Sequence, residues 1–141
     1  AVVADYSPNR PDYDSTEHWI AELDGTPIGW ICCWPVVDEL EETEIWFPLG
    51  VNETAAGIDY LLGRPLDGPT NRGRGIGSSM LRAFTSDIVF GRHADWTQAA
   101  AGPYTANVPS WRALEKAGFT NVGSVRGPCT VMVINRPDST H

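Results

Sequence analysis

The chain has 141 residues, which is the length of one domain that buries a substantial core. Hydrophobic residues make up 42% of it and charged residues 20%, so the composition is that of a globular domain and argues against a disordered chain. No apolar run reaches the roughly 18 residues of a membrane-spanning helix, and a net charge of −8 argues against a general nucleic-acid binder.

The N-terminal part is predicted to open with a loop and then form a hairpin. The first 18 residues are polar and broken by prolines, which indicates loop. Trp19–Leu23 and Pro27–Trp34 have the apolar pattern of strands, and the Asp24-Gly25 pair between them is typical of a hairpin turn.

The middle of the chain alternates strands with helices. The acidic segment Val36–Phe47 fits either a helix or a loop, whereas the apolar run Gly57–Gly63 predicts a buried strand. Prolines and glycines make Arg64–Thr70 a loop. Apolar residues at helical spacing predict an amphipathic helix over Gly77–Phe90, and a strand is expected at Trp96–Ala101.

The last part is predicted to hold one helix and two closing strands. The helix is capped by Asn107 or Ser110 and ends at Ala117, before Gly118. The strands are Phe119–Val125 and Thr130–Asn135. This order of elements predicts one α/β domain over residues 1–141, with a mixed sheet and a core over residues 19–135.

Cysteine and histidine positions give no sign of a disulfide framework or a metal site. Cys32 and Cys33 are adjacent and Cys129 is distant, so we expect free thiols in a reducing compartment. With no signal peptide visible, the expected location is the cytoplasm. The three histidines lack metal-ligand spacing.

Charge is distributed unevenly along the chain. Residues 1–59 contain 13 acidic residues against one arginine, a net charge of −12, and the remainder has five acidic against nine basic residues, a net charge of +4. This asymmetry suggests that the first part attracts a cation and the second holds an anion. The alternative interpretation is a solvated acidic surface.

A glycine-rich turn precedes the helix predicted at residues 77–90. Gly73, Gly75 and Gly77 allow successive amide groups to converge on an anion at a helix N-terminus. Because arginines and serines flank the glycines, a phosphate or pyrophosphate is the predicted ligand. The third glycine of the dinucleotide fingerprint and the lysine of the Walker motif are both absent. The candidate cofactor-binding residues here are Arg72, Gly73, Arg74, Gly75, Ile76, Gly77, Ser78 and Ser79.

The remaining pattern, R-x-x-G-x-G from Arg72 to Gly77, resembles the pyrophosphate loop of the GNAT superfamily of acetyl-CoA-dependent N-acetyltransferases. The segment Asn107–Phe119 is similar to the last helix and following strand of that family, at the right spacing from the turn. The resemblance covers Trp19 to about Asn135. It implies a mixed, splayed β-sheet flanked by helices, with a shortened N-terminal part.

The resemblance also implies how the cofactor is held. In GNAT proteins the pantetheine arm of coenzyme A lies between two splayed strands and pairs with one of them. The strand residues implied here are Tyr60, Leu61 and Leu62. Asn107 either contacts the arm or caps its helix.

Asp59 is the predicted general base. It interrupts an apolar strand, where a carboxylate is costly unless it faces a cleft, and burial is expected to raise its pKa toward neutrality. The alternative is that Asp59 faces solvent on the polar side of the strand.

The Gly57-Ile58-Asp59 strand looks like that of the aminoglycoside 6′-N-acetyltransferases, in which an acidic, tryptophan-bearing loop precedes it. The resemblance implies an amine of a polycationic small molecule as acceptor. The implied substrate-binding residues are Glu41, Glu42, Glu44, Trp46, Phe47, Asp59 and Tyr104. In the alternative interpretation Trp46 belongs to the core and the glutamates are solvated.

The chain departs from this family at positions that keep other functions open. Many GNAT helices carry a tyrosine that protonates the thiolate where this chain has Leu114, so the acid is water, another residue such as Tyr104, or not needed. Gly102 stands where the aminoglycoside branch has aspartate. Acetylation of a siderophore amine or protein N-terminus, or non-catalytic acyl-CoA binding, are the alternatives. The short N-terminal part predicts a substrate pocket that is incomplete or completed in a homodimer.

Overall fold

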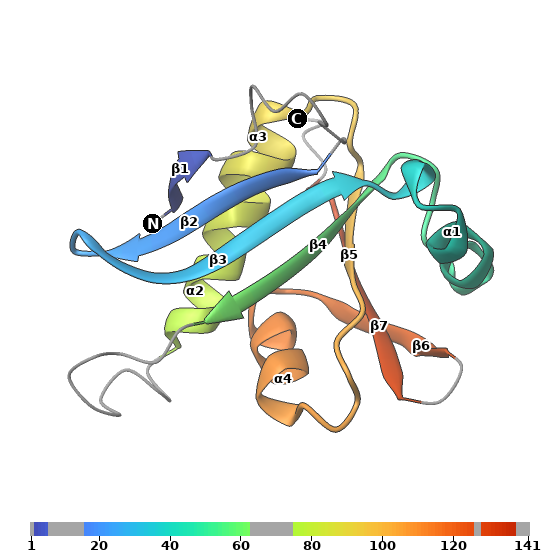
Figure 1. The fold of residues 1–141 in the computed structure, drawn as a ribbon. Helices are drawn as coiled ribbons and strands as arrows, with labels where there is room; N and C mark the ends of the chain where they lie inside the picture. Colours follow the sequence, from blue (N-terminus) through green and yellow to red (C-terminus); the bar gives the residue numbers. More distant parts are fainter. Residues whose placement is uncertain (1, 6–15, 63–74, 126–127, 138–141) are drawn as a thin grey trace.

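The structure is a computed structural model that describes residues 2–5, 16–62, 75–125 and 128–137. Its centre is a seven-stranded mixed sheet in the order β1-β2-β3-β4-β5-β7-β6 (Figure 1). The strands are β1 (Val2–Asp5), β2 (Glu17–Leu23), β3 (Thr26–Pro35), β4 (Ala55–Leu62), β5 (Gln98–Ala101), β6 (Thr120–Val125) and β7 (Cys129–Asn135). Helix α1 is Leu40–Trp46, between the 3₁₀ turns η1 (Val36–Asp38) and η2 (Phe47–Leu49).

The other helices contain one long, composite element. Helix α2 (Ile76–Ala83) continues through the π-helical segment η4 (Phe84–Val89) into α3 (Phe90–Arg92). Helix α4 (Val108–Lys116) lies between β5 and β6 in the chain. The long element runs behind β2 and β3 in Figure 1, whereas α1 stands beyond the end of β3. None of the helices in the described ranges is long and apolar enough to cross a membrane.

Two local signals in the sequence are confirmed. Asp24 (φ 52°) and Gly25 (φ 82°) form the left-handed turn that joins β2 to β3. Gly118 (φ 106°) ends α4: its N–H bonds to the carbonyl of Glu115, and the N–H of Phe119 bonds to that of Leu114. This pair of bonds is the Schellman arrangement, which favours glycine because of its positive φ.

Other sequence predictions are corrected or resolved. Val2–Asp5 is a strand, so the prediction of loop throughout residues 1–18 is wrong, and β2 begins at Glu17. β1 pairs antiparallel with β2, and the sequence of this four-residue segment alone does not predict that pairing. The ambiguous acidic segment is helical at Leu40–Trp46, and Asn107, not Ser110, is the N-cap of α4, although its side chain makes no capping hydrogen bond. The loop predicted at 64–70 lies outside the described residues.

The sheet separates two apolar cores. The larger packs α2, η4 and α4 against one face and includes Leu81, Phe84 and Leu114. The smaller lies against the part of the sheet near α1 and includes Trp46, Ala100 and Val131. Because both faces of the central strands are covered, β5 is buried at every residue.

The feature that matters for function is a divergence between β4 and β5. These strands pair in parallel only from Ala55–Gly57 to Gln98–Ala100, whereas β4 stays paired with β3 from Ala56 to Leu62. Since β5 ends at Ala101, β4 does not pair with β5 from Ile58 onward. The predicted mixed, splayed sheet flanked by helices is therefore confirmed.

Candidate active site

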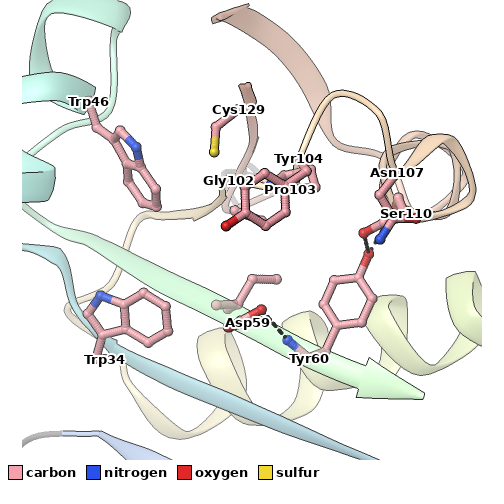
Figure 2. Close-up of a pocket in the computed structure, with 12 residues that line it drawn as sticks. Trp34, Trp46, Asp59, Tyr60, Gly102, Pro103, Tyr104, Asn107, Ser110 and Cys129 are labelled. Carbon is pink, nitrogen blue, oxygen red and sulfur yellow. Dashed lines mark hydrogen bonds between the residues drawn. The ribbon is translucent and has the colours of Figure 1, made fainter. Parts of the chain in front are cut away.

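A cavity of about 320 Å³ lies where β4 and β5 diverge (Figure 2). Its lining comes from β4, from α1, from the first turn of α4, from the ends of β3 and β5, from the loop after β5 and from the start of β7. The side chains used below are Trp34, Trp46, Asp59, Tyr60, Tyr104 and Ser110.

Asp59 lies on β4 at the wall of this cavity, as the sequence prediction requires of a base. It is exposed, however, so the expectation of a buried aspartate is wrong. Its Oδ1 accepts a hydrogen bond of 2.8 Å from the backbone N–H of Tyr60. β5 has already left β4 at this point, and none of the strands in the described ranges pairs with that edge beside Asp59.

Two tryptophans form an aromatic wall beside Asp59. Trp34 lies opposite Gly57 in the β3–β4 register, and a Cβ on Gly57 would be 2.4 Å from its indole ring. Trp46 packs in the same manner over Gly102, at 3.1 Å from a built Cβ. Figure 2 shows both indoles on one side of the cavity. Each ring therefore approaches the strand or loop backbone closely because its neighbour is glycine.

Of these two aromatic residues, only Trp46 is predicted from the sequence as a site residue. Trp46 is only 8% exposed and belongs to the smaller core, so it serves as core and cavity wall together. Trp34 was not proposed as a site residue. The signal that would have found it is the glycine directly across from it on β4, which becomes visible only once the register is known.

Tyr60 reaches from β4 to the first turn of α4. Its hydroxyl lies 2.5 Å from Ser110 Oγ and donates a hydrogen bond of 3.0 Å to the Ser110 carbonyl. Burial raises the pKa of the Tyr60 phenol above its ordinary 10.0, the bond with Ser110 lowers it, and the charge of Asp59 raises it. From the sequence, Tyr60 is predicted as a cofactor-binding residue through its backbone, whereas Ser110 is not predicted as a site residue.

The loop between β5 and α4 places Tyr104 and Asn107 at the cavity. The carbonyl of Tyr104 accepts a hydrogen bond from the N–H of Asn107 (2.9 Å), and Tyr104 forms an isolated bridge with Cys129 of β7. Tyr104 is 64% exposed, and its ring lies over the middle of the cavity in Figure 2. The loop is thus held by backbone bonds while the Tyr104 ring meets solvent.

The described acidic side chains of α1, Glu41 and Glu44, do not line the cavity. Glu41 and Glu44 are exposed, and Phe47 is 38% exposed; none of the three is among the residues that line the cavity. Of the substrate residues implied by the resemblance, the structure brings together Trp46, Asp59 and Tyr104. The side chain of Glu42 lies outside the described part of the structure.

The glycine turn is described only from Gly75 onward, and Arg72, Gly73 and Arg74 lie outside the described residues. Gly75 (φ 74°) is the N-cap of α2, and its carbonyl accepts hydrogen bonds from the Ser79 N–H (2.9 Å) and the Ser78 hydroxyl (3.0 Å). The amides before Ser79 have no partner within the helix. Because the helix dipole adds to them, this terminus suits an anion.

Comparison with known proteins agrees with this geometry. A family model described as an acetyltransferase (GNAT) domain matches residues 1–126. Aminoglycoside N(6′)-acetyltransferase type 1 of Klebsiella pneumoniae is 29% identical over 138 residues, which is 96% of this chain and 64% of that protein. The protein of the same name from Serratia marcescens matches to the same extent. The chain therefore spans less than two thirds of these relatives.

Solved structures give a similar result. The aminoglycoside acetyltransferase AAC(6′)-Ib in complex with coenzyme A and kanamycin has a TM-score of 0.67 and 26% identity, covering 86% of this chain and 67% of that one. The same enzyme with paromomycin and acetyl-CoA has a TM-score of 0.69 and 29% identity, covering 86% and 66%. From the family match, which extends over most of its length, the chain belongs to the GNAT family of acetyltransferase domains.

Proposed function

We propose that this protein is an N-acetyltransferase that moves the acetyl group of acetyl-CoA to a primary amine of a polycationic small molecule, an aminoglycoside acetylated at its 6′-amine. The observation that carries the proposal is the cavity at the divergence of β4 and β5, which holds an exposed carboxylate beside an aromatic wall. The names of the relatives, which are aminoglycoside acetyltransferases, support the same substrate class.

The chain offers places that fit acetyl-CoA. Backbone groups on the edge of β4 from Ile58 to Leu62 are left by β5 and suit the amides of an extended arm, as in the addition of a strand. The terminus of α2 at Gly75 suits a pyrophosphate. Acetyl-CoA supplies an activated acetyl thioester, and the residues of the chain position the amine beside it.

Asp59 has the geometry of the group that receives the proton of the amine. An ammonium must lose a proton before its nitrogen attacks a carbonyl, and an ionised, solvent-accessible carboxylate accepts it. The carboxylate also pairs with the cationic acceptor, and the net charge of −12 in residues 1–59 attracts it. The indoles of Trp34 and Trp46 give a sugar or an ammonium an apolar, π-rich face.

The test is steady-state release of coenzyme A thiol with kanamycin-like amines. Asp59→Asn keeps the size of the side chain and removes its basicity, so kcat/KM should fall by about 10²–10⁴-fold. Asp87→Asn is the matched control, because Asp87 is an exposed aspartate on η4 that does not line the cavity. Equal values of kcat/KM for Asp59→Asn and the wild type would show that Asp59 is not the general base.

The acceptor class has its own test. A panel with aminoglycosides, a siderophore amine and a peptide N-terminus, assayed with one enzyme preparation, ranks the acceptors by kcat/KM. Tight binding of acetyl-CoA without turnover of any amine would show that the chain is an acyl-CoA-binding domain and not an enzyme. A homodimer and a cytoplasmic location remain predictions, and sedimentation velocity tests the former.

A further inference from the structure

Transfer of an acetyl group from a thioester leaves a thiolate that must gain a proton, and the family position for the donor is Leu114, which has none to give. We propose that the Tyr60 hydroxyl, held by Ser110, is the general acid that protonates the departing thiolate. This inference rests on the proposed function. The general acid would then lie on strand β4, whereas the family position for it lies on helix α4.

The first support is the position of the phenol. Tyr60 follows Asp59 on β4, and neighbouring residues of a strand point to opposite faces of the sheet. The Tyr60 ring therefore extends toward α4, away from Asp59, and its hydroxyl meets Ser110 at 2.5 Å (Figure 2). Both Tyr60 and Ser110 line the cavity. A thioester threaded along the edge of β4 would pass between Asp59 and the Tyr60 hydroxyl.

The second support comes from helix geometry at Leu114. Residues 110 and 114 are four apart on α4, so they lie on one face, and side chains of a helix lean toward its N-terminus. A tyrosine at 114 would place its hydroxyl over the preceding turn, near Ser110. In this chain Leu114 is fully buried, and the hydroxyl at Ser110 comes from Tyr60. One phenol thus reaches the same turn from another element.

The third support is the protonation state. Burial and the charge of Asp59 raise the pKa of Tyr60 and outweigh the opposing effect of the bond with Ser110, so the phenol is protonated at neutral pH. The same desolvation makes a thiolate formed beside it more basic, which favours the transfer. Tyr104, the other phenol at the cavity, is 64% exposed and lies on a loop. Water can therefore take the place of Tyr104 as proton donor to the thiolate more easily than it can take the place of Tyr60.

The proton balance closes without another reagent. The ammonium acceptor first gives one proton to solvent through Asp59. The neutral amine nitrogen then forms a bond with the carbonyl carbon, the carbon–sulfur bond breaks, and the nitrogen gives up a second proton on the side of Asp59. The thiolate takes the Tyr60 proton and becomes the thiol. Tyr60 regains a proton from solvent through the Ser110 hydroxyl, so the net reaction of an ammonium acceptor releases one proton.

Tyr60→Phe tests this role because it removes only the hydroxyl. We expect kcat with acetyl-CoA to fall by about 10²-fold, while KM for the amine and the affinity for coenzyme A, measured by calorimetry, stay near the wild-type values. Tyr60→Phe/Leu114→Tyr returns a phenol to the turn of Ser110 and should recover at least part of the lost rate. A merely structural role for Tyr60 predicts no such recovery.

A readout without turnover separates this inference from the proposed function. The thiol of bound coenzyme A is titrated by the ultraviolet absorbance of its thiolate. A Tyr60 hydroxyl that donates to the thiolate lowers the thiol pKa, so Tyr60→Phe should raise it. If the wild type acetylates amines but Tyr60→Phe keeps its kcat and its thiol titration, only the inference fails. If the wild type binds coenzyme A but acetylates nothing, the proposed function fails, and an unchanged titration overturns the inference as well. Absence of coenzyme A binding refutes both.

Discussion

Gly57 has no side chain and so leaves room for the Trp34 indole in the wall of the cavity. Gly57→Ala should displace that indole. A Cβ at this position would lie 2.4 to 2.6 Å from three atoms of the Trp34 indole, whereas carbon atoms in contact prefer about 3.5–4.0 Å. The ring must therefore shift by about 1 Å. Overpacking of this kind costs about 1–3 kcal/mol of unfolding free energy. The φ of Gly57 is not in the left-handed region, so the backbone itself accepts alanine.

A double-mutant cycle isolates this contact. Unfolding in urea gives the free energies for the wild type, Gly57→Ala, Trp34→Ala and the double variant. With the indole removed, alanine at 57 meets no ring and reduces the entropy of the unfolded chain, so it should stabilise by about 0.4–1 kcal/mol. The sign of the effect of Gly57→Ala thus reverses between the two backgrounds.

The same variants report on function. Because a displaced Trp34 ring narrows or misplaces the acceptor side of the cavity, Gly57→Ala should raise KM for the amine more than it changes the affinity for coenzyme A. An equal destabilisation by Gly57→Ala with and without Trp34 would show that the ring does not lie on Gly57. The account of the aromatic wall would then be refuted.

Two further predictions concern stability. Arg136 donates to the carbonyls of Phe90, His93 and Trp96, and the His93 carbonyl also accepts from the N–H of Trp96. Arg136→Leu removes the guanidinium bonds to all three carbonyls and should lower the unfolding free energy by about 1–3 kcal/mol, read from the urea midpoint. An unchanged midpoint would contradict those bonds. The raised pKa of Tyr60, with Asp59 beside it and Ser110 of α4 facing it, makes the folded state bind a proton that the unfolded state loses above pH 10. This contribution to stability is complete below pH 10 and is lost as the pH rises through the folded pKa. The urea midpoint should therefore fall less steeply with rising pH in Tyr60→Phe than in the wild type. Identical dependences on pH in the two proteins would refute this contribution of Tyr60.

The features that the sequence predicts well are those decided by neighbouring residues. The turn at Asp24-Gly25 and the stop at Gly118 need positive φ, which these residue types accept, and both are confirmed. The helical segment after Gly75 follows from apolar spacing in the same way. The features that it missed depend on partners far along the chain. β1 exists because it pairs with β2, and Ser110 matters because Tyr60, 50 residues earlier, reaches it.

Asp59 shows the same limit within one residue. Its placement at a cleft follows from a carboxylate in an apolar strand, but the expectation of burial was drawn only from the apolar residues beside it in the sequence. The partner strand leaves at Gly57, two residues earlier, and that point is set by the short length of β5 and the glycine-proline sequence after it. No property of residues 57–62 alone reports where a neighbouring strand will end.

The divergence of β4 and β5 also places both residues of the proposed proton transfers, Asp59 and Tyr60, on one strand. β3 holds β4 in register from Ala56 to Leu62, so β4 stays extended although its other edge, beyond Gly57, pairs with none of the described strands. A ligand arm can then add to that edge without rearranging the sheet, which lowers the ordering cost of binding. Because strand residues alternate between faces, Asp59 points to the side of the tryptophans and Tyr60 to the side of α4. A thioester in the plane of the sheet would thus have the proposed proton acceptor, Asp59, on one face and the proposed proton donor, Tyr60, on the other, so the two proton transfers of the proposed reaction would not compete for the same space.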